Sequence, residues 1–169
     1  QENIENLDMW YSHIEISLDQ FELILDKKNY SLLSDEKLDK AFFYTFSTFG
    51  EKMRNSVFNA MESSGLIYKI DDIRIRDQIL ELYQKTYSRH DWMLDFDQTR
   101  YLKAYDVIMD EFVFDENDTS NIYWNLDWEN KRNFEQLKTN FRYKNHLLSN
   151  KENKKLYSIV NREAKEKTE

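Results

Sequence analysis

The 169-residue chain has no proline, no cysteine and only two glycines, and its net charge is −8. The shortage of turn residues excludes most sheet architectures, and the missing cysteines exclude disulfides and thiolate chemistry. The negative charge argues against a nucleic-acid partner, because phosphate binding needs a basic surface. We therefore expect an all-α protein: a single antiparallel helical bundle of five or six helices with coiled-coil-like seams, formed by residues 1–169.

Two helices are predicted before the first glycine. From Ile4 to Leu25, apolar residues recur at alternating intervals of three and four, which predicts a helix over Asn6–Lys27 with a coiled-coil-like seam. Asn29–Leu33 breaks the pattern, and Ser34 is placed to cap a second helix that runs toward a bend at Gly50. The seam residues are Ile4, Leu7, Tyr11, Ile14, Leu18, Phe21 and Leu25; those of the second helix are Leu38, Phe42, Phe43, Phe46 and Phe49.

A corner between two helices is predicted around Gly65. A helix from Ser56 to Ser64 should end there, because glycine adopts the left-handed conformation that closes a helix. We expect a positive φ angle at Gly65. Asp71 and Asp72 then offer caps for the next helix. The buried side of that helix is predicted to consist of Ile75, Ile79, Leu82, Tyr83 and Thr86.

The helical pattern then continues without a glycine or proline. One helix over Asp72–Phe112 would be about 60 Å long, and since such lengths are uncommon we expect a break between Ser88 and Trp92. Asp115–Asn121 is predicted to be a loop, and a last helix should begin near Asp127 and fray over Arg162–Glu169. The apolar residues of the last helix are Trp128, Phe134, Leu137, Phe141, Leu148, Leu156 and Ile159.

Charge is distributed unevenly over the second half of the chain. Residues 128–169 carry 11 basic and 6 acidic side chains, whereas residues 91–127 carry 10 acidic and 2 basic ones. We therefore expect these segments to dock antiparallel, with the charges flanking an apolar seam. The alternative is a free basic helix that binds an acidic partner or membrane headgroups. The expected seam joins Phe134, Leu137 and Phe141 to Tyr101, Tyr105, Ile108 and Phe112, with Lys138, Arg142 and Lys144 opposite Asp97, Asp106 and Asp110.

One sequence pattern is compatible with catalysis. The dipeptide His90-Asp91 in an all-helical chain resembles the metal-binding pair of the HD phosphohydrolases. Such a site needs further ligands, and the only other histidines are His13 and His146. A cytoplasmic, metal-dependent phosphohydrolase is therefore the alternative function. The simpler interpretation is a half-exposed histidine beside a solvated acid, and we expect no metal and no cofactor.

Aromatic residues provide the best candidate for a recognition surface. Tyr123, Trp124 and Trp128 lie close together in the sequence, and Trp92 is expected nearby. Aromatic side chains with a polar atom are common at interfaces and in ligand pockets. The alternative is that they close the end of the bundle under the Asp115–Asn121 loop, which would make them part of the core.

Part of the chain resembles a family of short bacterial proteins that is described as a domain of unknown function. The resemblance covers about a fifth of the chain and rests on Val57-Phe58-x-x-Met61-x-Ser63-Ser64-Gly65-Leu66-Ile67, Ile70-Asp71, Ile75-Arg76 and Leu82-Tyr83. This sequence differs at Gln84, where a second tyrosine is common, and it lacks the membrane helix with which members start. The resemblance implies that a membrane helix precedes Gln1 and that the domain lies outside the cytoplasm.

The sequence thus predicts a non-enzymatic interaction or sensing domain, tethered to a bacterial membrane on its extracytoplasmic side. The expected partner is a protein or a small ligand, and the sequence is also compatible with a homo-oligomer. The resembling family has no established activity to transfer, so it bears on architecture and location only.

Overall fold

The computed structural model describes residues 2–25, 32–115 and 126–168, and their regular structure is helical apart from one isolated antiparallel bridge between Phe114 and Leu126. With the continuous rod α4–η3–α5 counted once, these residues form six α-helices, which confirms the all-α bundle. The elements are α1 (Glu2–Leu25), α2 (Asp35–Phe46), α3 (Ser56–Ser63), the 3₁₀ turn η2 (Leu66–Lys69), α4 (Ile73–Glu81), the π-helix η3 (Leu82–Tyr87), α5 (Ser88–Glu111), α6 (Lys131–Thr139) and α7 (Phe141–Thr168).

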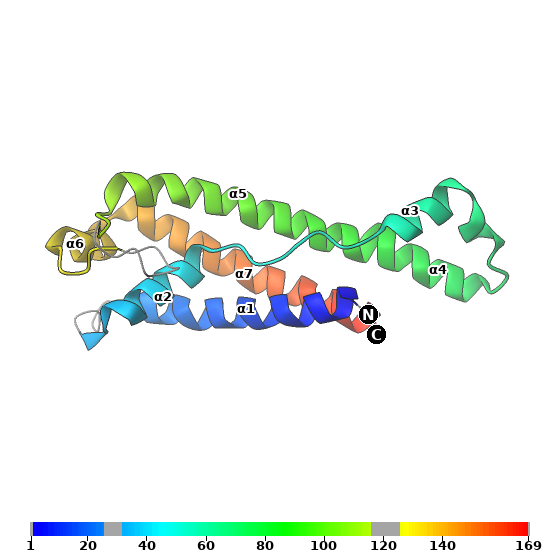
Figure 1. Ribbon diagram of the computed structural model, residues 1–169, viewed down its shortest axis with the longest axis horizontal. Coiled ribbons are helices and arrows are strands. Elements are labelled where there is room, and N and C mark those ends of the chain that lie inside the picture. The colour runs from blue at the N-terminus through cyan, green and yellow to red at the C-terminus, as the bar shows by residue number, and fades with distance from the viewer. Residues whose placement is uncertain (1, 26–31, 116–125, 169) are drawn as a thin grey trace.

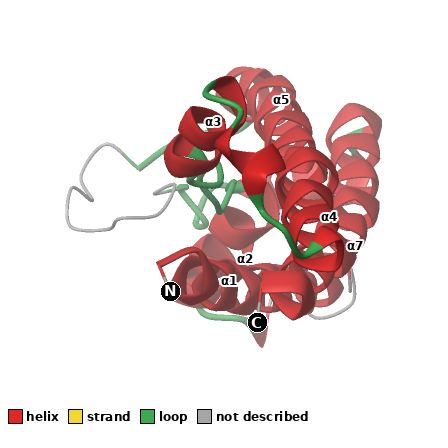
Figure 2. Cartoon of the chain, turned by 90° about the vertical axis from the view of Figure 1, so that its right-hand side faces the viewer, coloured by secondary structure: helices red, strands yellow, loops and turns green. Residues whose placement is uncertain are grey.

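Three long helices run side by side along the bundle. α7 packs against both α1 and α5, and α2 lies beside α1 at the end near α6 (Figure 1). The chain passes from α5 through α6 into α7, so α7 runs antiparallel to α5, as the charge distribution predicts. Figure 2 views these helices from the side on which α3 and α4 extend. No described helix is both long and apolar enough to cross a bilayer.

The buried side of α1 is rotated from the predicted one. Leu7, Ile14 and Phe21 are buried as expected, whereas the flanking Tyr11, Leu18 and Leu25 are only partly buried. Alternating intervals of three and four are nevertheless kept, since the complete buried stripe is Leu7, Trp10, Ile14, Ser17, Phe21 and Ile24. The spacing is that of a coiled-coil seam, while supercoiled packing itself stays a prediction.

In α7 the prediction selected the wrong side of the helix. Phe141, Leu148, Leu156 and Ile159 are exposed to solvent. The buried stripe is partly polar and again follows alternating intervals of four and three: Tyr143, Leu147, Asn150, Lys154, Tyr157, Asn161 and Ala164. The helix also begins later than predicted, because α6 is a separate helix that ends at Thr139. It does not fray: it continues to Thr168, with Ala164 fully buried.

The core at the α6 end of the bundle is aromatic. The Phe42 ring from α2 lies parallel to the Tyr143 ring from α7, with 5.7 Å between their centroids, and also contacts Phe112 and Trp128. Leu137 is buried in this cluster and Phe134 packs against it, so the predicted docking seam forms in part. Phe141 is not part of it, being 74% exposed.

An extended strap, residues 47–55, runs along the bundle and connects α2 to α3 (Figure 1). Gly50 adopts φ 144°, and a Cβ atom there would lie 2.5 Å from the Tyr157 hydroxyl oxygen, so glycine is needed at this bend. The backbone N–H of Met53 donates to Asp91 Oδ1 at 2.9 Å, and the Ser47 carbonyl accepts from Lys154 Nζ. The strap therefore fastens α5 and α7 through its main chain.

Candidate functional site

The arm, made of α3, η2 and α4 (residues 56–81), extends beyond the ends of α1 and α7 (Figure 1). Its turn forms as predicted: α3 ends at Ser63, and Gly65 adopts φ 71°. Asp72 caps α4, its Oδ1 accepting from the N–H groups of Arg74 at 2.9 Å and Ile75 at 3.4 Å. Local signals therefore fold the chain back on itself at this point.

Few side chains hold the arm together from inside. Phe58 and Ile67 are its buried residues, and the Phe58 ring stacks on Tyr83 with a centroid distance of 4.5 Å and an interplanar angle of 2°. Burial, with a smaller contribution from Tyr87, raises the pKa of the Tyr83 phenol. Gln84 Nε2 donates to Glu62 Oε1 at 2.5 Å, which adds a polar link between α3 and the rod.

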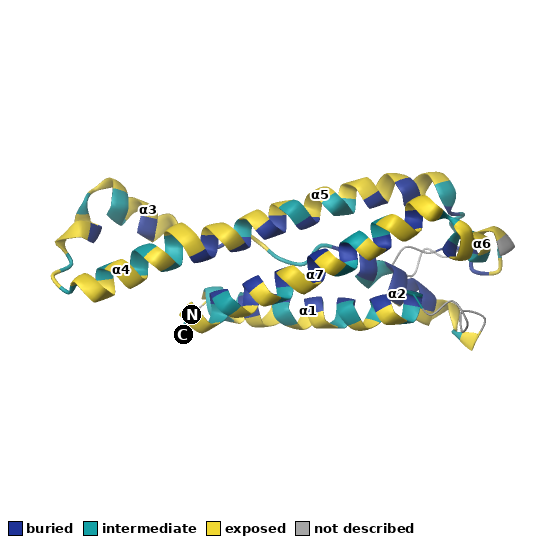
Figure 3. Ribbon diagram, turned by 180° about the vertical axis from the view of Figure 1, so that it is seen from behind, coloured by how far each residue is buried: buried dark blue, intermediate teal, exposed yellow. Residues whose placement is uncertain are grey.

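The outside of the arm exposes several large apolar side chains. Its α4 helix has no buried residue (Figure 3). This corrects the prediction for Ile75, which is 50% exposed, and for Ile79, which is only partly buried. The exposed large apolar residues of the arm, which we call the arm surface, are Val57, Leu66, Tyr68, Ile73 and Ile75, with exposed fractions of 49–72%.

The rod that carries the arm is continuous, so the break predicted between Ser88 and Trp92 is absent. The irregularity lies earlier, in the π-helical turn η3. A π-helical turn has one more residue between hydrogen-bonded groups than an α-helical turn, and such turns are frequent at functional sites. Leu82 and Tyr83 in η3 pack against the bundle, and Thr86 and Tyr87 are buried.

Polar contacts with the end of α7 secure the base of the arm. Lys167 Nζ lies 2.8 Å from Glu81 Oε1, and the Tyr87 and Thr168 hydroxyl oxygens are 3.0 Å apart. An ion pair between Arg89 and Glu163, at 2.6 Å, lies one turn further along. Lys167 also lowers the pKa of Glu81 by a hydrogen bond and by its charge. These contacts fix where the arm leaves the bundle.

The predicted aromatic set is not brought together. Trp128 is 4% exposed in the core, where its Nε1–H donates to Asp39 Oδ1 at 2.7 Å, so it has the alternative, structural role. Trp92 is 60% exposed near the start of α5, whereas Trp128 lies near the end of that helix. At a rise of about 1.5 Å per residue, the two tryptophans are about 30 Å apart. Tyr123 and Trp124 lie outside the described residues.

Trp92 belongs instead to a stack along the outer side of α5. Its ring lies parallel to that of Phe96, with a centroid distance of 5.4 Å and an interplanar angle of 8°. The Arg100 guanidinium lies 4.4 Å from the centre of the Phe96 ring. Such a stack holds the exposed indole in one orientation.

His90 is fully buried, which contradicts the half-exposed histidine of the simpler interpretation. It stacks on Trp10 at 5.4 Å, and its Nε2 lies 3.2 Å from the Tyr157 hydroxyl. Asp91 accepts the Met53 N–H of the strap, and His13 stacks on Phe49. Within residues 2–25, 32–115 and 126–168, no group of three or more His, Asp or Glu side chains could hold a metal ion.

A second buried polar group lies further along α5 and α7. Lys154 pairs with Asp97, whose other oxygen accepts from Asn153 Nδ2 at 2.8 Å. The charge argument placed Asp97 opposite the basic group Lys138, Arg142 and Lys144, so its pairing with Lys154 is a correction. Burial lowers the pKa of Lys154, an effect that Asp97 opposes. Burial, together with the charges of Asp97 and Asp91, raises the pKa of Tyr157.

Sequence reasoning missed the arm surface, although a signal was present. Ile73 and Ile75 are two positions apart, which places them on different sides of a helix, so one partner helix cannot cover both. The pair Asp97–Lys154 had no such signal, because both residues lie in charged stretches that resemble solvated helix faces.

Comparison of the chain with protein-family models, with curated proteins and with solved structures found no match.

Proposed function

We propose that this protein is a non-enzymatic interaction domain that binds a protein partner through the arm surface. The observation that carries the proposal is the combination of an α4 helix without a buried residue and five exposed large apolar side chains on one projecting element. An apolar surface of this kind is costly in water and is typical of sites that another molecule covers.

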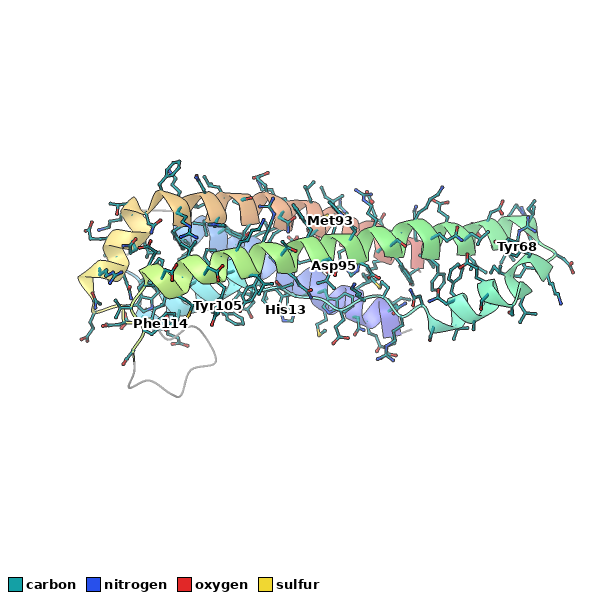
Figure 4. The ribbon with its side chains drawn as sticks, turned by 90° about the horizontal axis from the view of Figure 1, so that it is seen from above. His13, Tyr68, Met93, Asp95, Tyr105 and Phe114 are labelled. Atoms are coloured by element: carbon teal, nitrogen blue, oxygen red, sulfur yellow. The ribbon has the colours of Figure 1, made fainter. Side chains whose placement is uncertain are left out.

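The way in which the arm is built supports this role. Asp72, Gly65 and the Phe58–Tyr83 stack give the arm a defined shape, and the Lys167–Glu81 pair fixes its base. A surface that is ordered before binding loses less conformational entropy in a complex. Tyr68, 59% exposed near the tip, has the large amphipathic side chain that is common at the centre of protein interfaces (Figure 4).

The location remains a proposal that rests on the resemblance of residues 57–83 to the family with an N-terminal membrane helix. We propose that the domain is tethered to a membrane and lies on its extracytoplasmic side. The genomic sequence upstream of Gln1 tests this. An apolar segment of about 20 residues with a basic flank is expected there, and its absence would remove the basis for this location.

Site-specific photocrosslinking in the source cells tests the binding role. A benzophenone amino acid at Tyr68 should give a discrete adduct, whereas the same residue at Tyr105, an exposed tyrosine near the other end of the rod, should not (Figure 4). An adduct with twice the mass of the chain would identify the partner as a second copy.

A matched variant separates binding from folding. Ile75→Ser alters an exposed side chain, so the free energy of unfolding should change by less than about 0.5 kcal/mol. The Tyr68 adduct should nevertheless weaken, because the apolar contact is lost. Adducts of equal yield from Tyr68 and Tyr105, or none from either, would refute the assignment of the arm as the binding element.

A further inference from the structure

Cationic side chains from α5 and α7 meet where these two helices lie side by side (Figure 3). Arg100 Nη1 on α5 donates to Ser149 Oγ on α7, which joins the two helices at this point. Lys103 follows Arg100 by one helical turn, and His146 and Arg142 precede Ser149 by one and two turns. Residues one turn apart share a side of a helix, so all four basic residues lie along the same junction. We call Arg100, Lys103, Arg142 and His146 the cation cluster.

The cation cluster has no acidic partner in the described part of the chain. Lys103 and Arg142 form no ion pair there, and neither do Asp106 and Asp110, the α5 acids that the charge distribution placed opposite α7. The helices therefore dock as predicted, but these predicted ion pairs do not form. Asp97, the next acid toward the start of α5, is already paired inside the bundle. Water weakens the repulsion between like charges without removing it, so an anion that binds here would stabilise the cluster.

Arg100 is held in position before any ligand binds. It is partly buried, with its guanidinium 4.4 Å from the centre of the Phe96 ring and its Nη1 bound to Ser149. Its Nη2 makes no hydrogen bond to the described residues and is not among the buried atoms, so solvent reaches it. A fixed guanidinium with an accessible N–H group loses little conformational entropy when it binds an anion.

His146 is the second partly buried member of the cluster. Its ring forms no hydrogen bond within the described residues, and its nitrogens are not among the buried atoms, so a ligand can reach them. Burial lowers the pKa of His146, and the charges of Arg142, Arg100 and Lys103 lower it further. In the described residues, α1, α2 and α6, which also pack against α7, contribute no charged group to this shift. A proton on His146 would therefore add a fourth positive charge to three existing ones.

We propose that the cation cluster binds a phosphate monoester group, carried by a soluble ligand or by a lipid headgroup. Arg100 Nη2 and the Arg142 guanidinium would donate to the phosphate oxygens, and the Lys103 ammonium would supply a third charge. A doubly charged phosphate fits this cluster better than a carboxylate does. It offsets more of the repulsion, and its three outer oxygens can accept from donors on both helices at once.

NMR titration with sulfate tests the site on the wild-type chain, because sulfate stays doubly charged between about pH 5.5 and 8, where phosphate itself titrates. At constant ionic strength, the Ser149 amide signal should shift with a Kd on the order of 1–10 mM at about pH 8. Binding should be at least about threefold tighter at about pH 5.5, since a proton on His146 adds a positive charge. His146→Gln should bind sulfate equally at both pH values. Acetate, with a single charge, should bind about tenfold more weakly than sulfate.

Variants of exposed residues separate a defined site from a general response to charge. Arg142→Ala and Lys103→Ala should each weaken sulfate binding about fivefold or more. Lys144→Ala is the matched control: it removes the same charge from α7, but Lys144 is two positions from both Arg142 and His146 and so lies on another side of the helix. Its Kd should change by less than about twofold. Equal weakening by Lys144→Ala and Arg142→Ala, or no shift of the Ser149 amide at about 50 mM sulfate, would overturn the proposal.

Vesicles distinguish the two sources of the phosphate group. The chain is sedimented with phosphatidylcholine vesicles that contain about 20% phosphatidic acid, whose headgroup is a phosphate monoester. Sedimentation that Arg142→Ala abolishes and Lys144→Ala does not would assign the phosphate to a lipid. Sulfate binding without sedimentation would support the site and assign the phosphate to a soluble ligand. None of these results depends on the arm surface, which the crosslinks at Tyr68 test separately.

Discussion

Lys154 and Asp97 form an ion pair inside the bundle, with side chains only 2% and 4% exposed. The Lys154 ammonium also donates to the Ser47 carbonyl oxygen at 2.9 Å and lies 5.5 Å from the centre of the Phe49 ring. Lys154→Met keeps most of the length of the side chain but removes its charge. Asp97 then remains buried with the Asn153 amide as its partner.

The expected destabilisation is large. Breaking a buried ion pair on one side typically costs about 3–5 kcal/mol, because the remaining charge is uncompensated. The Ser47 carbonyl also loses a donor, which adds about 1 kcal/mol. We expect Lys154→Met to lower the free energy of unfolding by about 4–6 kcal/mol, a large share of the total of about 5–15 kcal/mol that such a domain has. Asp97→Asn should have a similar effect for the converse reason.

Urea unfolding followed by circular dichroism measures these changes. The double variant Lys154→Met, Asp97→Asn removes both charges, so it should be less destabilised than the sum of the single variants by at least about 2 kcal/mol. Lys155→Met is the matched control, because that neighbour forms only an exposed pair with Glu152 and should change stability by less than about 1 kcal/mol. Additive single effects, or a loss below about 1 kcal/mol for Lys154→Met, would refute the reasoning.

Gly50→Ala should destabilise the fold by about 2–3 kcal/mol, because the new Cβ atom would overlap the Tyr157 hydroxyl. Gly65→Ala has free space around it and should cost only about 1 kcal/mol, so equal urea midpoints for the two variants would contradict this prediction. Burial and nearby carboxylates raise the pKa of Tyr157, so stability should fall above pH of about 10, and Tyr157→Phe should flatten that limb of a melting profile. Burial and nearby cations lower the pKa of His146, so the free energy of unfolding should fall as the pH drops below about 6.5. The fall should be smaller in His146→Gln, and an equal fall in both proteins would contradict this prediction.

Local signals in the sequence were sufficient for several helix ends. Ser34 precedes α2, Asp72 caps α4, and Gly65 ends α3 with a positive φ angle, all as predicted. These features depend on residues within one turn of each other, and glycine and capping side chains specify them without help from tertiary contacts. The Ser34 side chain, however, makes no capping hydrogen bond, so the position was predicted correctly but the contact was not.

The buried side of α7 could not be predicted by hydrophobicity. Its stripe places Asn150, Lys154 and Asn161 at positions where apolar residues are normally expected, while Leu156 and Ile159 are exposed. The polar side chains are buried because partners from other elements meet them, such as Asp97 for Lys154 and the Leu7 carbonyl for Asn161. Those partners are distant in sequence, so the periodic pattern of apolar residues within α7 contains no information about them.

The candidate site was missed for a related reason. Helical periodicity shows where a helix has an apolar side, but it does not show whether another helix lies opposite that side. Ile75 fits the same periodic pattern as Thr86, yet Thr86 is buried in η3, whereas Ile75 is half exposed in α4, a helix of the arm that extends beyond the ends of α1 and α7. The prediction of an aromatic surface was wrong for a similar reason. Proximity in sequence grouped Trp128 with exposed aromatic residues, whereas its indole is buried in the core and donates a hydrogen bond to Asp39.

The pairing of the first helix with the last has a consequence for how the chain folds. Asn161 reaches back to Leu7 across 154 positions, and α7 fills the space between α1 and α5. Most helical bundles fold within microseconds to milliseconds because their contacts are local, whereas contacts between distant segments slow the search. On the ribosome, α2 can cover the Phe21–Ile24 end of the α1 stripe early, but Leu7, Trp10 and Ile14 stay partly uncovered until α7 has been made, and in that interval they are open to chaperones and to other nascent chains.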